Sequence, residues 1–209
     1  MLKCPYNNSC IKAECDLACS EFSEFTHWCN RCNISLSSPA ISASFEKIKL
    51  ADDLIKQAHD DEYLEGSNYI HLSVYRGDNN PLMSDLVSYI AICKYCEHKG
   101  FYNGVYKLNF SKYIDEIKKS WTTRQDSIDL ENMKIWIQSS NYLVVYNLGL
   151  VRFGDFESQT LLTILQDRYD IEKHTIFIME KGKSALLGKP DSMFYAKLKR
   201  EVNLRGGSS

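Results

Sequence analysis

Short apolar runs alternate with helical patterns along most of this chain, from about residue 69 onward. The expected strands are residues 69–75, 104–110, 141–147 and 174–179, and the expected helices are residues 84–99, 112–121, 126–138, 157–169 and 190–202. Strands that alternate with helices usually run parallel, because each crossover back to the sheet is long enough to hold a helix. The third run is apolar without interruption, as in strands that are buried on both faces. The pattern therefore predicts an α/β fold with three layers and a mainly parallel sheet.

The first strand leads into a stretch with the layout of a phosphate-binding loop. Residues 70–84 read IHLSVYRGDNNPLMS, so a strand runs into Gly77 and a helical pattern begins near Ser84. In a working loop, G-x-x-x-x-G-K-S/T, the lysine reaches the outer phosphates and the hydroxyl holds magnesium. Here Leu82 and Met83 replace the second glycine and the lysine. The sequence thus predicts a degenerate loop in which Gly77 and Ser84 are the remaining cofactor positions and ATP is not held.

Six of the eight cysteines lie within the first 32 residues. Cys29 and Cys32 form a C-x-x-C pair that can place two thiolates on one ion, and Cys15 and Cys19 can supply the opposing pair. Residues 1–35 have too few aliphatic side chains to fold by burial alone, so a bound metal would stabilise them. The pattern predicts a small metal-binding module with structural zinc on these four cysteines.

Other assignments of the cysteines stay open. An iron–sulfur cluster would satisfy four thiolates equally well, and disulfides or unliganded thiols are a third interpretation. The alternative ligands in the same segment are Cys4, Cys10 and His27. Cys93 and Cys96 have helical spacing, which favours two buried thiols over a second metal site with His98.

The chain divides by composition into four parts. After the module at residues 1–35, a serine-rich linker is expected at 36–49, the main domain at 50–203 and a flexible tail at 204–209. A polar, acidic helix at 46–65 would lead into the main domain. No run approaches 18 apolar residues and the N-terminus lacks a signal pattern, so we expect a cytoplasmic protein that does not enter a membrane.

The order of these motifs resembles one family, the DnaC/DnaI/IstB group of AAA+ proteins. Its members are bacterial helicase loaders and the ATPase subunits of certain transposons. The resemblance covers residues 50–203 and is carried by three stretches: the loop at 75–84, the strand and helix at 104–118, and YLVVYNLG at 142–149. The last of these is similar to the family's Walker B strand. The resemblance implies an AAA+-like P-loop domain.

The departures from the family pattern fall on its catalytic positions. Tyr146 and Asn147 replace the Walker B acids that hold magnesium and orient water. Glu180 stands near the polar sensor position, where a carboxylate would repel the γ-phosphate. Met193 and Lys197 stand where the family's last helix has arginines that reach a neighbouring subunit's nucleotide. Because phosphoryl transfer depends on positioning and charge neutralisation, we expect a pseudo-ATPase that is not an enzyme.

The resemblance implies a non-catalytic, loader-like accessory protein in DNA replication or in phage or mobile-element biology. Its partners would be a replicative helicase, single-stranded DNA, and further copies of itself or a catalytically competent relative. One alternative is a structural adaptor subunit of a larger nucleoprotein complex. Another is a weak residual ATPase that uses Ser84 and Asp85, with Asp155 in place of a lost acid.

Two basic surfaces are candidates for contact with DNA. The C-terminal surface consists of Lys197, Lys199, Arg200 and Arg205. The other lies around residues 112–124, where basic and aromatic side chains mix: Lys112, Tyr113, Lys118, Lys119, Trp121 and Arg124. Basic grooves with aromatic platforms suit single strands. The alternative is that these side chains are the solvated faces of amphipathic helices.

Overall fold

The computed structural model describes residues 20–34, 44–59, 72–77, 80–97, 104–124, 127–148, 154–171 and 173–180. In these ranges the elements are, in chain order, α1 (Ser20–Arg31), α2 (Phe45–His59), β1 (Leu72–Gly77), α3 (Asn80–Glu97), β2 (Val105–Asn109), α4 (Phe110–Thr123), α5 (Ile128–Ser139), β3 (Tyr142–Tyr146), α6 (Asp155–Asp170) and β4 (His174–Glu180). None of the helices described is long and apolar enough to span a membrane.

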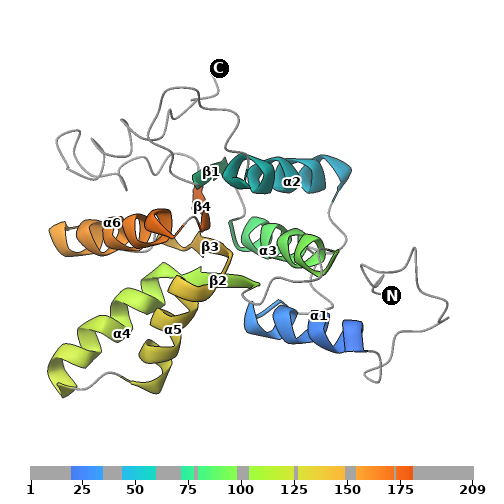
Figure 1. Ribbon diagram of the computed structural model, residues 1–209. Helices are drawn as coiled ribbons and strands as arrows, with labels where there is room; N and C mark the ends of the chain where they lie inside the picture. Colours follow the sequence, from blue (N-terminus) through green and yellow to red (C-terminus); the bar gives the residue numbers. More distant parts are fainter. Residues whose placement is uncertain are drawn as a thin grey trace.

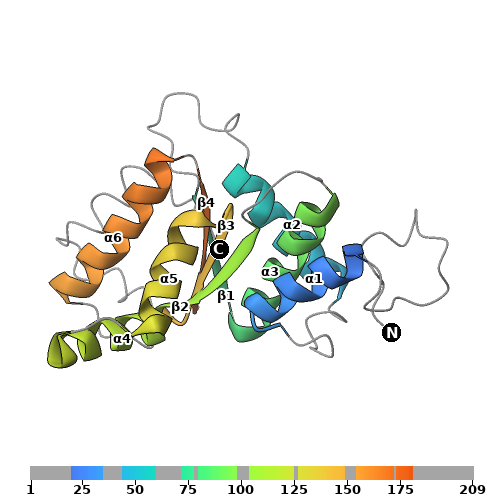
Figure 2. The same ribbon diagram turned by 60° about the horizontal axis from the view of Figure 1, so that its bottom comes forward.

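The four strands form one parallel sheet in the order β1-β4-β3-β2. From β1 the chain crosses over two strand positions to reach β2, and it then returns one strand at a time through β3 to β4. Because parallel crossovers are right-handed, steps in opposite directions place their helices on opposite faces. Accordingly α3 lies on one face together with α1 and α2, while α4, α5 and α6 cover the other (Figures 1 and 2). The predicted α/β class with a parallel sheet is confirmed for the described residues.

Each face of the sheet has its own apolar core, since successive strand side chains point to opposite faces. In β3, Leu143 and Val145 belong to the core beneath α4, α5 and α6, whereas Val144 belongs to the core beneath α1, α2 and α3. All three are fully buried. This is the double burial that the uninterrupted apolar run predicts.

Helix α1 packs against α3 and β2, and its C-terminal turn belongs to the α/β core. The Trp28 ring lies on Gly104, where a Cβ atom would stand only 2.7 Å from ring carbons. The Arg31 guanidinium lies between Trp28 and Trp136, 4.9 and 5.0 Å from the two ring centroids. Trp136 belongs to α5, so this stack joins helices on opposite faces next to β2. The described end of the predicted N-terminal module thus shares a core with the main domain.

Several element limits differ from the expected ones. Helix α2 begins at Phe45, so the last residues of the expected linker are helical. The sequence predicts Ser111 as the N-cap of the helix at 112–121, but Asn109 caps α4 instead: its side chain accepts from the Lys112 backbone N–H at 3.2 Å. The sequence allows Asp126 or Ser127 as the cap of the next helix, and Ser127 caps α5, accepting from the N–H of Leu130. The helix expected at 190–202 and the tail at 204–209 lie outside the described residues.

Candidate functional site at the carboxyl edge of the sheet

In open parallel sheets, ligands bind outside the carboxyl ends of the strands, where neighbouring connections leave toward opposite faces. Here β1 is followed by α3 on one face and β3 by α6 on the other, with β4 between the two strands. In the strand register Gly77 is opposite Glu180, and Asn109 is opposite Tyr146. The fold therefore brings the sequence-predicted positions of the loop, the sensor and the Walker B strand to one edge.

The predicted phosphate loop is partly helical. Helix α3 starts at Asn80, and Pro81 is compatible with its first turn, where the backbone N–H has no partner within the helix. Met83 is 4% exposed and packs in the core. Ser84 is fully buried, and its hydroxyl donates to the Pro81 carbonyl at 2.8 Å. The expectation that the helix begins near Ser84 is therefore wrong, while the cofactor role of Gly77 and Ser84 stays a prediction.

An ion pair lies between α3 and β2 at this edge. The Lys107 ammonium is 2.5 Å from Asp85 Oδ1, and only 5% of the Lys107 side chain is exposed. The Tyr146 ring lies over the same ammonium, 5.4 Å from its centroid. Burial raises the pKa of the Tyr146 phenol, and a hydrogen bond with Asn109 opposes that shift. Tyr146, at the expected position of a Walker B acid, thus places a neutral aromatic ring beside Lys107. The charge of Lys107 is already neutralised by Asp85.

Two further residues of the expected nucleotide site, Asn147 and Asp155, are also described. Asn147 follows β3 with a φ of 58°, in the left-handed region that asparagine tolerates better than most residues. Asp155, considered as a substitute acid, is the exposed first residue of α6. Lys107 is not among the residues predicted from the sequence; the one signal for it is a charged residue inside an otherwise apolar strand.

Only part of the predicted metal set is described. Cys29 and Cys32 are buried in the core, and the Cys32 thiol donates to the Val105 carbonyl at 3.4 Å. Burial raises the pKa of Cys32 to about 12, so these surroundings favour the neutral thiol, whereas zinc takes thiolates. His27 is exposed and packs edge-on against Trp28.

The described ranges hold no group of three or more side chains that could bind a metal ion, and the other candidate ligands lie outside them: Cys4, Cys10, Cys15 and Cys19. Zinc binding therefore stays a prediction. Cys93 is half-buried on α3 and packs against the core, as expected for a structural thiol.

Two of the four basic side chains on the predicted surface around α4 form ion pairs, while Lys112 and Arg124 are exposed. Lys118 pairs with Glu157 and Lys119 with Glu116, each at 2.7 Å. Tyr113 is buried and so offers no platform for a base. Trp121 is 57% exposed, but its ring packs edge-to-face on Phe156, with the centroids 4.7 Å apart. The C-terminal basic residues lie outside the described chain: Lys197, Lys199, Arg200 and Arg205.

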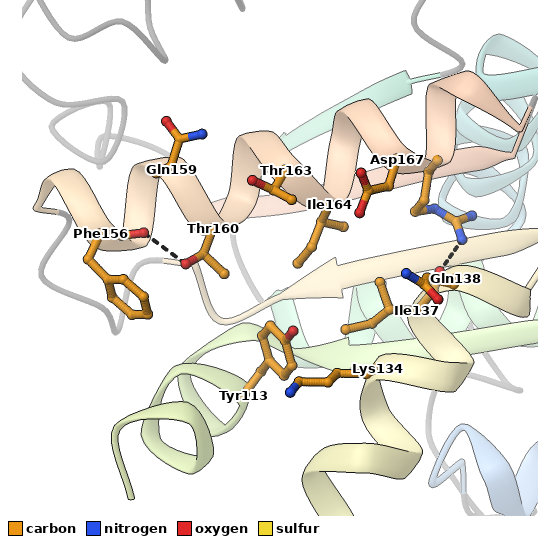
Figure 3. Close-up of a pocket in the computed structure, with 11 residues that line it drawn as sticks. Tyr113, Lys134, Ile137, Gln138, Phe156, Gln159, Thr160, Thr163, Ile164 and Asp167 are labelled. Carbon is orange, nitrogen blue, oxygen red and sulfur yellow. Dashed lines mark hydrogen bonds between the residues drawn. The ribbon is translucent and has the colours of Figure 1, made fainter. Parts of the chain in front are cut away.

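The structure also has a hollow of about 270 Å³ between α5 and α6, which no motif predicted. Figure 3 shows two aliphatic and two aromatic side chains among its lining: Ile137, Ile164, Phe156 and Tyr113, the last with a phenol oxygen. Its walls are polar: Lys134 and Gln138 on α5, and Gln159, Thr160, Thr163, Asp167 and Arg168 on α6.

Comparison with known proteins finds no matching family model, no matching curated protein and no matching solved structure. Function is therefore inferred from residues and geometry.

Proposed function

We propose that this chain is a non-catalytic, helicase-loader-like accessory protein that acts in DNA replication or in phage or mobile-element biology. Its α/β domain serves as a platform for other macromolecules. The observation that carries the proposal is that the expected nucleotide-binding positions at the carboxyl edge of the sheet make other contacts within the chain. Met83 packs in the core, the Ser84 hydroxyl bonds its own helix, and Tyr146 covers Lys107.

The sheet order supports descent from an AAA+ ancestor. AAA+ proteins place the strand before the sensor between the phosphate-loop strand and the Walker B strand. The order β1-β4-β3 has the same arrangement, with Glu180 at the end of the middle strand. Since fold alone does not define function, the role as a loader-like protein rests on this likeness together with the altered site.

The charges at the carboxyl edge of the sheet also support a site that does not catalyse phosphoryl transfer. Phosphoryl transfer requires cations on the phosphates and carboxylates on magnesium. The described edge has a cation at Lys107, but Asp85 neutralises it at 2.5 Å in largely buried surroundings. A phosphate group that bound Lys107 would have to displace Asp85. Breaking a largely buried ion pair in this way is costly, because the carboxylate loses its lysine.

The proposal is tested by mixing the full chain with the replicative helicase of the same organism. Complex formation is measured by sedimentation velocity, and ATP turnover by phosphate release. We expect a complex that forms equally with and without ATP, and no turnover by the chain alone. Turnover by the purified chain, or the absence of a helicase complex, would contradict the proposal. Recovery in a larger nucleoprotein complex without helicase would favour the structural adaptor.

A further inference from the structure

Strand β2 lies at one end of the sheet order, and among the described residues no further strand pairs with its outer side. The Gly104 carbonyl faces β3, where it accepts from the backbone N–H groups of Asn141 and Tyr142 at 2.9 and 3.2 Å. Since the backbone polar groups of successive strand residues point to opposite sides, those of Val105 and Lys107 point to the outer side. An open edge of this kind is a template for pairing with another chain, so proteins usually cover it.

The Cys32 thiol bonds to this outer edge at two points. It donates to the Val105 carbonyl at 3.4 Å, and the Lys107 backbone N–H donates to its sulfur. A residue of a neighbouring parallel strand would make the same two bonds, because it donates to one residue of β2 and accepts from the residue two positions later. Cys32 thus takes the hydrogen-bonding place of one residue of an additional strand.

The end of α1 holds this thiol in position. Asn33, directly after Cys32, has a φ of 51°, and the Ile34 N–H donates to the Cys29 carbonyl at 2.8 Å. These are the features of a Schellman helix end. Trp28 in the same turn packs on the glycine that precedes β2, and α1 contacts the strand (Figure 1). Cys32 is 1% exposed, so water has little access to its hydrogen bonds.

This arrangement does not suit metal binding by the same thiol. A zinc ligand is a thiolate, which has no proton to donate, so the hydrogen bond to the Val105 carbonyl would be lost. A buried carbonyl without a partner is costly. Capping of the strand edge and ligation of zinc are therefore exclusive roles for Cys32.

We propose that the C-terminal turn of α1 is a fixed part of the α/β domain that closes the β2 edge, and that Cys32 caps this edge and is not a metal ligand. Any zinc would then be held without this thiol. With the turn in place, a partner cannot add a strand beside β2. The role of Cys32 is the same whether or not the chain binds a helicase, so it extends beyond the proposed function.

The test is amide hydrogen exchange of the full chain, followed by NMR. The Lys107 N–H bonds to the Cys32 sulfur, whereas the Leu108 N–H faces β3 by the same alternation along the strand. Cys32→Ala should raise the exchange rate of the Lys107 amide at least about threefold relative to that of Leu108, because only Lys107 loses its acceptor. Cys32→Ser should recover part of this loss, since a hydroxyl also donates and accepts.

The matched control is Cys93→Ala, which removes a half-buried thiol of α3 that packs against the same core. It should leave the ratio of the two exchange rates unchanged. Equal acceleration of both amides in Cys32→Ala would show that the thiol only fills space, and this result would overturn the proposal.

Metal content is the second measurement. The wild-type chain and Cys32→Ser are expressed with added zinc, and the zinc bound per chain is determined by elemental mass spectrometry. We expect the same content in both, whatever its level. A lower zinc content in Cys32→Ser would identify the thiol as a ligand and would likewise overturn the proposal.

Discussion

At the scale of single residues, Gly104 shows how closely α1 approaches the sheet. Gly104→Ala would place Cβ 2.7 Å from the Trp28 ring, which Arg31 and the core hold in place. We expect the free energy of unfolding to fall by about 1–3 kcal/mol, as for other overpacked core sites. Urea unfolding followed by tryptophan fluorescence measures it. Gly154→Ala is the control, since its new Cβ meets only the flexible Glu157 carboxylate at 3.1 Å. Equal losses in both variants would contradict this view of Gly104.

Because the Cys32 thiol is buried, the free energy of unfolding should fall at alkaline pH. Its pKa is raised to about 12 in the folded chain, against about 8.5 when unfolded. The folded state therefore holds this proton more tightly, and the stabilisation is complete below about pH 8.5 and declines as pH rises toward 12. Between pH 8 and 10 (values near the unfolded pKa), urea unfolding should show a loss of about 1–2 kcal/mol.

The Cys32→Ala variant serves as the control for that pH dependence, and its stability should change less over the same range. If zinc binds this thiol, the opposite behaviour is expected: stability would fall on acidification and on chelation. Metal analysis of the purified chain distinguishes the two, so the same experiment tests the predicted zinc module.

At the scale of elements, Arg168 joins α6 to the ends of its neighbours. Its fully buried guanidinium donates to the carbonyls of Ile137, Ser140 and His174 at 2.5, 3.0 and 2.6 Å. It also donates to the Thr175 hydroxyl at 2.9 Å. Burial lowers the pKa of Arg168 to about 9, which still leaves it charged at neutral pH. One side chain thus ties α5 to β4 at the amino edge of the sheet.

Replacing this arginine should weaken several junctions at once. Arg168→Met leaves buried carbonyls unsatisfied, and we expect a loss of about 3–5 kcal/mol in chemical unfolding. Arg168→Lys should recover only part of it, because an ammonium cannot match the planar fork of donors. Gln166→Met, which removes one exposed hydrogen bond to Asp170, should cost less than about 0.5 kcal/mol. Full recovery by lysine would show that charge, not the fork, matters.

At the scale of the whole molecule, restoring the loop lysine should not restore an ATPase. Met83 points into the core at 4% exposure, so Met83→Lys would bury an ammonium. We expect no phosphate release above background and a loss of about 2 kcal/mol or more in stability. Met83→Leu, which keeps the site apolar, should cost less than about 1.5 kcal/mol. ATP turnover by the lysine variant would show that the site retains its catalytic geometry.

Residues whose environment depends on distant parts of the chain were beyond prediction. The apolar run through β3 depends on near neighbours and is predicted from the sequence, as is a helix cap at Asp126 or Ser127, of which Ser127 is the one that forms. The Lys107–Asp85 pair joins residues 22 positions apart in sequence, and Arg168 reaches Ile137 across 31. The early start of α3 has a local cause, because Pro81 suits the first turn of a helix as well as a loop.

Local periodicity in the sequence determined the α/β class and the alternation of strands and helices, because side-chain spacing of two or 3.6 residues is a property of neighbouring positions. Tertiary structure alone decided the strand order, the packing of α1 on β2 through Trp28, and the hollow between α5 and α6. These features depend on which surfaces meet after crossovers of 20 residues or more (roughly the span of a helix with its loops). Burial then selects the arrangement that covers both faces of the sheet at once.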